Sequence, residues 1–471
     1  MNLVNLTLST KAISSDEQSA QLLYGLIAQR GLVGSKRLQA LTGKSQASIA
    51  RALAKLASLE GQLIQLGKAR RTLYAVPKSI LGFSGEQALS VTLQDGRVVN
   101  WGRLCFLEGK RIYVEATHPA MKGWSCVTEG ALPWFLGPLR LQGFLGKLRG
   151  TSMGFADSNP EHWSLEQVLF AVLAHEHDNL GAFSLDRLLR NQNGSSQSLA
   201  PIGLAARGDY YDSISEDAAR MITNGSSAGG EQPKFLAQIQ AQTQVQTGET
   251  ESLIVKFTPP RGTPFGERWH DLLHAEAMAL YTLSKHGIAV AQPRIVQTQR
   301  RTYLESVRFD RVSIGKRHMV ALASVHEAFV GVARQHWAAT CETLYKQNRL
   351  SAEDLLTAQT VFEFGRLIGN TDMHFGNLSL FVDDLLRIDN PSFTLAPVYD
   401  MLPMMYRPSE FLGELGYAPF ALPEAATNSA EARAKAIRIA LDFWQAMSQH
   451  VPASKGFRAL ATEMQHRLLV L

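Results

Sequence analysis

The nine residues GNTDMHFGN at 369–377, followed by VYDM at 398–401, constrain this chain more than any other feature. They place one acid, Asp372, before an amide, Asn377, and a second acid, Asp400. Phosphoryl transfer needs a carboxylate that accepts the proton of a hydroxyl group, and oxygen ligands that hold Mg²⁺ on nucleotide phosphates. The spacing therefore predicts a site in which Asp372 is the catalytic base while Asn377 and Asp400 bind Mg²⁺.

A lysine inside an apolar strand supports the same chemistry. The run SLIVKF at 252–257 predicts a strand that carries Lys256. A buried ammonium group is costly without an anionic partner. The helical pattern RWHDLLHAEAMALYTLSKHGI that follows offers Glu276 and ends near Gly287, so we expect a Lys256–Glu276 pair that sets the nucleotide pose. The alternative is a lysine at a strand edge whose ammonium group reaches solvent.

A glycine-rich turn precedes this strand. In TNGSSAGGEQPKFL at 223–236, Gly229 and Gly230 allow backbone N–H groups to approach an anion closely, and Lys234 follows them. We expect all three to contact ATP phosphates. The pattern G-x-x-x-x-G-K-[ST] is absent, which argues against a P-loop NTPase. By itself the turn is equally compatible with a flexible hairpin.

Two further segments complete the predicted core. The segment 292–312 predicts two strands that lead into a hinge, where backbone groups of Val307 and Phe309 would meet the edge of an adenine. Residues 350–369 predict an amphipathic helix that carries the acid loop, and TLAPVYDM is expected to return Asp400 on a short strand.

The positive charge of the chain is confined to its beginning. Residues 1–78 hold eleven Lys/Arg and three Asp/Glu, a net charge of +8, whereas the remainder holds 36 Lys/Arg and 39 Asp/Glu. The pattern there predicts three helices and then two strands joined by a basic turn, which is the layout of a winged helix-turn-helix. A basic domain of this kind favours nucleic acid as its partner.

Docking of the third helix in a major groove defines the candidate DNA contacts. Its first residues would reach base edges or nearby phosphates, and the basic turn of the wing would meet phosphates. The candidates are Ser45, Gln46, Ser48 and Arg51 on the helix and Lys68, Arg70 and Arg71 on the wing. The alternatives are a winged helix used for protein contacts and an ordinary solvated basic face.

Taken together, these motifs resemble the HipA-like serine/threonine protein kinases of bacterial toxin–antitoxin systems. The resemblance covers roughly residues 80–450 and rests on SSAGGEQPKF, LIVKF, AEAMALYTLSKHGI, VRFDR, NTDMHFGN and VYDM, all in order. The winged-helix extension looks like the YjjJ-type branch of that family. The resemblance implies an α+β, bilobal, protein-kinase-like fold with ATP and Mg²⁺ in the cleft.

The resemblance also implies residue roles and shows departures. Ser226 occupies the position at which family members autophosphorylate, and Ser227 is adjacent to it. A phosphate there would add negative charge at the nucleotide pocket and disfavour ATP. Gly376 stands where the best-known members have a lysine, and the glycine-rich loop is one residue longer before Lys234. His374 matches the family's loop histidine and is expected to be structural.

The expected organisation has four parts. They are a winged helix-turn-helix DNA-binding domain at 1–78, a small β-rich subdomain at 79–150, a kinase small lobe with the glycine-rich loop at 151–310, and a helical large lobe with the catalytic loop at 311–471. Three widely spaced cysteines fit a reducing compartment, and no run reaches the ~18 apolar residues that a membrane span needs. We therefore expect a cytoplasmic protein with no membrane partner.

The main hypothesis is an ATP- and Mg²⁺-dependent serine/threonine protein kinase that acts as a toxin, autophosphorylates and binds DNA. Its expected partners are a protein substrate, DNA, an antitoxin and a second copy of the chain, since helix-turn-helix proteins often read paired half-sites. One alternative is a transcription regulator whose kinase-like body senses nucleotide without transferring phosphate. Another is a small-molecule phosphotransferase, because such enzymes use the same D-x-x-x-x-N pattern of catalytic acid and metal-binding amide.

Overall fold

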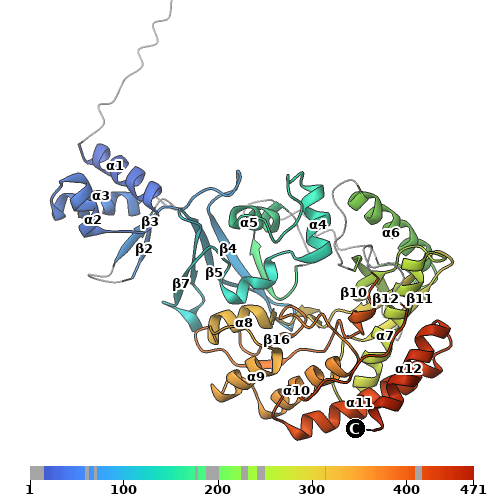
Figure 1. The fold of residues 1–471 in the computed structure, drawn as a ribbon. Coiled ribbons are helices and arrows are strands. Elements are labelled where there is room, and N and C mark those ends of the chain that lie inside the picture. The colour runs from blue at the N-terminus through green and yellow to red at the C-terminus, as the bar shows by residue number, and fades with distance from the viewer. Residues whose placement is uncertain are drawn as a thin grey trace, which may run out of the picture.

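The computed structural model shows an α+β protein whose strands form several separate sheets (Figure 1). The residues that it describes are 15–58, 63–67, 72–174, 179–186, 201–223, 232–240, 250–312, 314–408 and 416–470. Across these stretches no helix is both long enough and apolar enough to cross a lipid bilayer.

The N-terminal part contains the three helices and two strands expected from the sequence, together with one further short strand. Its elements are α1 (Ser15–Arg30), β1 (Val33–Gly34), α2 (Ser35–Thr42), α3 (Gln46–Ala57), β2 (Ile64–Leu66) and β3 (Leu73–Ala75). The strands form one antiparallel sheet in the order β1-β3-β2. Ser45 caps α3, because its side chain accepts a hydrogen bond from the N–H of Ser48.

The small N-terminal sheet packs directly on the next sheet of the chain. Apolar side chains from both sheets form one buried cluster: Ile64, Leu66 and Ala75 from the first, and Cys105, Leu107 and Tyr113 from the second. The chain between them also pairs with the second sheet, because the N–H of Lys78 donates to the carbonyl of Phe106 at 2.7 Å. The helical face of the N-terminal part therefore projects away from the body (Figure 1).

The second sheet has five antiparallel strands in the order β7-β6-β5-β4-β8. They are β4 (Glu86–Thr92), β5 (Val98–Leu107), β6 (Arg111–Ala116), β7 (Ser125–Glu129) and β8 (Phe183–Asp186). The turns between β4 and β5 and between β5 and β6 each contain a glycine in the left-handed region, Gly96 at φ 82° and Gly109 at φ 76°. Since β8 pairs with β4, this sheet runs on to residue 186, past the boundary expected at residue 150.

A four-stranded antiparallel sheet follows, in the order β11-β12-β10-β9. Its strands are β9 (Lys234–Gln240), β10 (Thr250–Phe257), β11 (Pro293–Gln297) and β12 (Thr302–Val307). Apolar side chains on one face pack against Phe144 of α4 (Gly143–Ser152) and Tyr211 of α6 (Arg207–Thr223). Because side chains alternate between faces along a strand, Lys256 lies on the opposite face, toward α7 (Pro264–Lys285).

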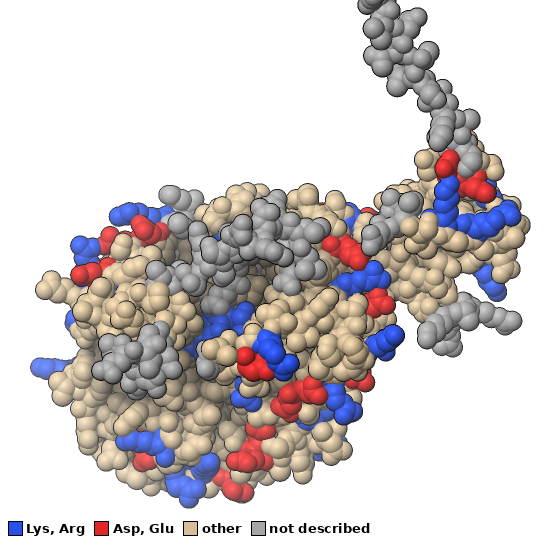
Figure 2. All heavy atoms as spheres, turned by 180° about the vertical axis from the view of Figure 1, so that it is seen from behind, with Lys and Arg blue, Asp and Glu red and all other residues tan. Residues whose placement is uncertain are grey.

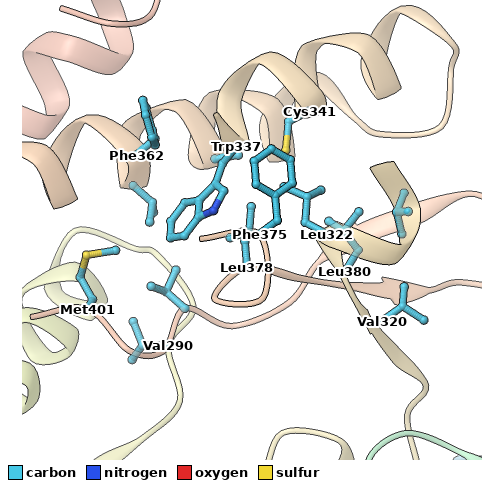
Figure 3. Packing of buried hydrophobic residues seen from close by; sticks show 14 of the residues in the cluster. Val290, Val320, Leu322, Trp337, Cys341, Phe362, Phe375, Leu378, Leu380 and Met401 are labelled. Carbon is cyan, nitrogen blue, oxygen red and sulfur yellow. The ribbon is translucent and has the colours of Figure 1, made fainter. Parts of the chain in front are cut away.

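The C-terminal part is mainly helical and lies along the lower edge of Figure 1. Its helices are α8 (Leu322–Phe329), α9 (Trp337–Lys346), α10 (Ala352–Leu367), α11 (Ala430–Gln449) and α12 (Lys455–Leu468). Its strands are β13 (Arg311–Val312), β14 (Gly315–Lys316), β15 (Met319–Ala321), β16 (Ser379–Val382) and β17 (Phe393–Leu395). The acid loop lies between α10 and β16, and Figure 3 shows the apolar core beneath it.

Candidate active site

Lys256 joins three separate elements. From β10 its ammonium nitrogen Nζ lies 2.5 Å from Oε1 of Glu276 on α7, and it also pairs with Oδ1 of Asp400. Lys256 is 5% exposed and Glu276 is 1% exposed. The predicted Lys256–Glu276 pair is therefore present, and the alternative in which the ammonium group reaches solvent is excluded. The contact with Asp400 also connects the four-stranded sheet to the C-terminal part.

The charges of this cluster are strongly coupled. Burial tends to raise the pKa of Asp400, but the attraction of Lys256 and Lys234 outweighs it and holds that pKa at about 2. Burial opposes the charged form of Lys256, yet the carboxylates of Asp400 and Glu276 raise its pKa above the ordinary value. Burial raises the pKa of Glu276, and Lys256 offsets part of that effect. The Lys256–Asp400 pair is therefore ionised at neutral pH.

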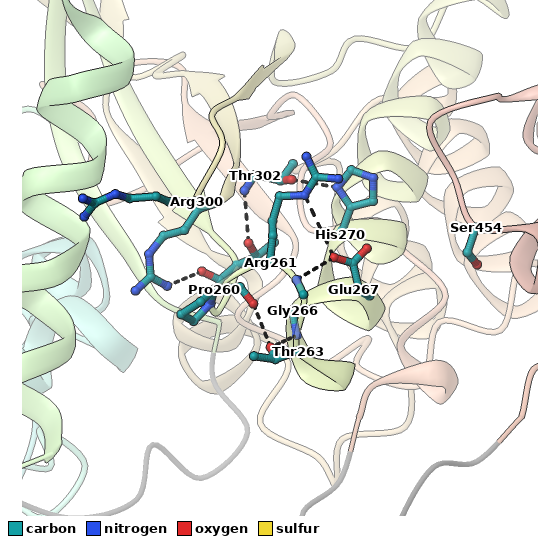
Figure 4. A network of polar contacts seen from close by, with 12 residues as sticks. Pro260, Arg261, Thr263, Gly266, Glu267, His270, Arg300, Thr302 and Ser454 are labelled. Carbon is teal, nitrogen blue, oxygen red and sulfur yellow. Dashed lines mark hydrogen bonds and ion pairs between the residues drawn. The ribbon is translucent and has the colours of Figure 1, made fainter.

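Glu276 is held in place because α7 is anchored at its start (Figure 4). Thr263 caps the helix by accepting a hydrogen bond from the N–H of Gly266 at 3.0 Å. One turn later, His270 bonds through Nδ1 to the hydroxyl of Thr302 on β12 at 2.7 Å. These contacts fix the helix to the sheet that carries Lys256, so both members of the ion pair belong to one rigid unit.

The acid loop begins where α10 ends. Gly369 ends this helix with a φ of 76°, a left-handed conformation that favours glycine, and Asp372 follows three residues later. Asp400 lies beyond the end of β17 rather than on a short strand, so that expectation was wrong. Its φ is 52°, which costs a non-glycine residue about 1–2 kcal/mol. Such strain persists only where surrounding contacts hold the residue.

Two side chains that the sequence analysis missed tie the acid loop to the segment around Asp400. The buried amide of Asn370 accepts from the N–H of Asp372 at 3.0 Å and donates to the carbonyl of Asp400 at 3.4 Å. The hydroxyl of Tyr399 donates to the carbonyl of Gly376 at 2.8 Å. The two loops that carry the predicted catalytic groups are therefore cross-linked by side chains.

Asn377 also stabilises the acid loop. Its amide nitrogen Nδ2 donates to the carbonyl of Asp372 at 2.9 Å, so the amide oxygen Oδ1 is the atom that remains for a cation. Below the loop, Phe375 and Leu378 are buried in the apolar core, and the indole of Trp337 donates to the carbonyl of His374 at 3.0 Å (Figure 3). The loop is thus anchored on both sides of Asp372 and Asn377.

The predicted hinge is only partly available for a base. The N–H of Val307 already donates to the carbonyl of Gln292 at 3.2 Å, so of its two backbone groups the carbonyl remains. The ring of Phe309 lies 5.9 Å from that of Tyr399 and 5.8 Å from that of Phe381. Phe309 thereby places the end of the small-lobe sheet next to the segment that carries Asp400.

Several predicted site residues lie outside the described part of the chain. They are Ser226, Ser227, Gly229 and Gly230 of the glycine-rich turn, and Lys68, Arg70 and Arg71 of the basic turn. Lys234 is described: it begins β9 and is the direct partner of Lys256 in the antiparallel pair of β9 with β10. Figure 2 shows Lys and Arg side chains, drawn in blue, inside the central hollow of the main body of the molecule.

The candidate DNA-binding residues of α3 lie at its N-cap and in its first half. Ser45, Gln46 and Arg51 are exposed, and Ser48 is half-buried. The side-chain oxygen of Ser45 is engaged in capping the helix, which leaves Gln46 and Arg51 as the longer side chains on this surface. Figure 2 shows basic side chains on the same projecting part of the molecule.

The donor set around Asp400 fits Mg²⁺. The ion prefers hard oxygen ligands from one or two protein side chains, with the remaining positions filled by phosphates and water. An ionised carboxylate at Asp400 and the amide oxygen of Asn377 supply that number and type of ligand. Lys256 and Lys234 place positive charge on one face of the four-stranded sheet. This charge would attract the negatively charged phosphates of a nucleotide.

Comparison with known families matches two parts of the chain. The family described as "HipA-like C-terminal domain" matches residues 226–468, and the family described as "YjjJ-like toxin, middle domain" matches residues 84–190. A curated relative, toxin YjjJ of Escherichia coli strain K12, is 31% identical over 442 residues, which cover 90% of this chain and 92% of that protein.

Two solved structures show more distant similarity. HipA of Shewanella oneidensis MR-1, solved with HipB and its operator DNA, has a TM-score of 0.49 and 16% identity over 81% of this chain and 96% of that one. The proinflammatory kinase CtkA of Helicobacter pylori has a TM-score of 0.33 and 12% identity over 47% of this chain and 87% of that one.

Proposed function

This chain belongs to the HipA-like family, in its YjjJ-type branch, and we propose that it is an ATP- and Mg²⁺-dependent serine/threonine protein kinase. The observation that carries the proposal is the position of Lys256, which pairs with Glu276 and Asp400 at once. A lysine, a helix carboxylate that pairs with it and a metal-binding carboxylate are the parts that protein kinases use to hold nucleotide phosphates.

The roles of the residues follow from their positions. When bound, ATP supplies the transferred phosphoryl group and Mg²⁺ neutralises charge on its phosphates. In our proposal Asn377 and Asp400 hold the metal ion, and Asp372 accepts the proton of the attacking hydroxyl group. Lys256 and Lys234 bind phosphate oxygens, with Glu276 orienting Lys256 and Gly229 and Gly230 offering backbone N–H groups.

The base of the nucleotide would lie against the same face of the small-lobe sheet. Leu236 and Ile254 are direct strand partners and are half-buried on the face that carries Lys256. Their apolar side chains suit the flat face of an adenine, while the carbonyl of Val307 and the backbone of Phe309 would meet its edge.

We further propose that the enzyme modifies its own Ser226 or Ser227. The phosphoserine would add nearly two negative charges to the glycine-rich turn, which we propose binds ATP phosphates, and so would lower the affinity for the nucleotide. Mass spectrometry of the protein after incubation with ATP, compared with the Ser226→Ala and Ser227→Ala variants, would locate the phosphate.

The N-terminal part is proposed to be a winged helix-turn-helix that binds DNA. Its net charge of +8, the exposed Gln46 and Arg51 on α3, and the projection of its helices away from the body support this role. Ser45, Ser48 and the basic residues Lys68, Arg70 and Arg71 complete the proposed surface. A homodimer would present two such surfaces to paired half-sites.

The curated relative is named as a toxin, and we propose that this chain likewise arrests growth by phosphorylating a protein substrate. An antitoxin that binds the chain is the expected partner of such an activity. The substrate would approach Asp372, which is half-buried, with a serine or threonine hydroxyl group.

The Asp372→Asn variant tests the proposed chemistry. We expect it to bind ATP with Mg²⁺ like the wild type, but to lose phosphate transfer, because the amide cannot accept the hydroxyl proton. The exposed Asp389→Asn variant is the matched control and should keep full activity. A nucleotide-sensing regulator would instead show ATP binding and no labelled product even in the wild type.

A further inference from the structure

Asn370 lies at the junction of the two loops that form the proposed site. It follows Gly369, and its N–H donates to the carbonyl of Gly365 at 2.8 Å, so the end of α10 sets its position. Asn370 is 4% exposed. A polar side chain this deeply buried is stable only if its hydrogen-bonding groups have partners.

Both ends of the Asn370 amide are used. The oxygen Oδ1 accepts from the N–H of Asp372 at 3.0 Å, and the nitrogen Nδ2 donates to the carbonyl of Asp400 at 3.4 Å. The same nitrogen lies 3.6 Å from Sδ of Met401. Only this orientation of the amide matches a donor with an acceptor at each end, so the geometry assigns its oxygen and nitrogen.

The two bonded groups belong to the residues that perform the proposed chemistry. One bond holds the backbone of Asp372, the proposed base. The other holds the carbonyl of Asp400, whose strained φ of 52° needs such support. The amide of Asn377 holds the other side of Asp372 at 2.9 Å, so two asparagines fix the backbone of the base from opposite ends.

We propose that Asn370 is a positioning residue that sets the distance between the carboxylates of Asp372 and Asp400. It is buried, and both of its polar ends are occupied within the protein, so it acts through its neighbours and touches neither nucleotide nor substrate. The inference rests on the proposed function, because it assigns the base to Asp372 and the metal ion to Asp400. Loss of the amide lets Asp400 leave its strained conformation and Asp372 move away from the metal-binding oxygen atoms.

The test uses the full chain with Asn370→Ala and the near-isosteric Asn370→Leu, together with Asn390→Ala at an exposed position as the matched control. Mn²⁺ and ADP are the probes. We measure ADP binding without metal, the Mn²⁺ concentration for half-saturation with ADP present, and kcat and KM for phosphate transfer. Outer partners of metal ligands typically contribute about 10- to 100-fold to metal affinity or activity.

We expect the Mn²⁺ concentration for half-saturation to rise at least roughly tenfold in both Asn370 variants, and kcat to fall at least roughly tenfold. Hydrogen bonds that support metal ligands have effects of this size. Metal-free ADP binding and the KM for ATP should stay within about twofold of the wild type, as they do in Asn390→Ala, since Asn370 does not touch the nucleotide. A merely structural role would lower ADP binding and metal binding together.

Unchanged Mn²⁺ half-saturation and kcat in a folded Asn370→Leu protein would overturn the inference. So would a parallel loss of metal-free ADP binding, which would indicate general damage to the fold. If Asn370→Ala does not fold, Asn370→Leu decides, because it fills the space of the amide. A wild type that binds ADP and Mn²⁺ but transfers no phosphate would refute the proposed function, and the Mn²⁺ comparison would still decide the role of Asn370.

Discussion

Lys234 lies directly opposite Lys256 in the antiparallel pair of β9 and β10, so that both ammonium-bearing side chains share one face of the sheet. Their surroundings differ. Lys256 is buried and paired with Glu276 and Asp400, whereas Lys234 is half-buried and acts on Asp400 through longer-range attraction. Substitution of each lysine in turn therefore distinguishes the effect of a direct ion pair with Asp400 from the effect of a nearby positive charge.

Lys256→Met should destabilise the protein by about 3 kcal/mol at neutral pH, because it leaves the buried carboxylate of Glu276 and the half-buried carboxylate of Asp400 without their shared cation. The deficit relative to the wild type should shrink as the pH falls, since protonation of Glu276 or Asp400 removes their repulsion. Urea unfolding at about pH 8 and pH 5 measures the difference. Lys234→Met, which removes only a longer-range attraction to Asp400, should destabilise the protein much less at either pH.

Lys256→Met should also raise the affinity of the nucleotide-free protein for Mn²⁺. In the wild type the ammonium group of Lys256 competes with any cation for the carboxylate of Asp400. Equal Mn²⁺ affinities of the Lys256→Met and Lys234→Met proteins, measured by titration, would show that the direct contact has no such effect.

Gly365→Ala should disturb the acid loop although alanine is the better helix former. A Cβ atom at Gly365 in α10 would clash with Sδ of Met373 and lie 3.2 Å from Sδ of Met401. We expect lower stability and lower transfer activity, and partial recovery of both when Met373→Ala is added. Gly25→Ala in α1 is the control: a Cβ there meets nothing within 4 Å, so it should stabilise the protein by about 0.5–1 kcal/mol.

Much of the small lobe could be predicted because its signals are local. The apolar run at 252–257 predicted β10, and the helical pattern after it predicted α7 with its end near Gly287, which has a φ of 78°. The Lys256–Glu276 pair followed from these elements, since a lysine in an apolar strand needs a partner. Here the patterns within the two segments were enough to predict a contact between residues that are distant in the sequence.

The segment around Asp400 could not be predicted in the same way. Its left-handed backbone has no signature in an aspartate, and its contact with Lys256 joins residues far apart in the sequence. Asn370 did leave a signal, because asparagine side chains commonly bond the N–H two residues further along, as Asn370 does with Asp372. The second half of its role, the bond to Asp400, depends on the tertiary fold.

His318 should make stability depend on pH. It is buried, its Nδ1 accepts from the N–H of Ala182 at 3.1 Å, and its Nε2 donates to the carbonyl of Phe135 at 2.9 Å. Burial lowers its pKa to about 4. The unfolded chain, with an ordinary pKa of about 6.5, therefore binds more protons than the native state between these values. The free energy of unfolding should rise with pH across that window. The contribution of His318 is lost as the pH falls through the same window.

The His318→Gln variant isolates this contribution, which amounts to at most about 3 kcal/mol. Its unfolding free energy should change less than that of the wild type between about pH 4 and pH 6.5. His466→Gln, at an exposed position on α12, should keep the slope of the wild type. Parallel pH profiles for the wild type and His318→Gln would contradict the assignment.

Arg51→Ala should weaken DNA binding if α3 enters the groove as proposed. If Arg51 contacts a base edge, we expect the binding free energy to weaken by about 1–3 kcal/mol. If it contacts a phosphate, the slope of log K against log salt concentration should be smaller by roughly one. Titration of labelled duplex DNA at several salt concentrations distinguishes the two. Arg438→Ala, an exposed arginine on α11, removes the same charge from the body and should leave DNA binding unchanged.

Incubation of the purified protein with γ-labelled ATP, with and without Mg²⁺, tests the central claim most directly. We predict Mg²⁺-dependent label on serine or threonine of a protein, including the chain itself, and its loss in Asp400→Asn, because that variant lacks the carboxylate that Lys256 contacts and that we propose as the metal ligand. Nucleotide binding without any labelled protein, or label that appears only on a small molecule, would contradict the account.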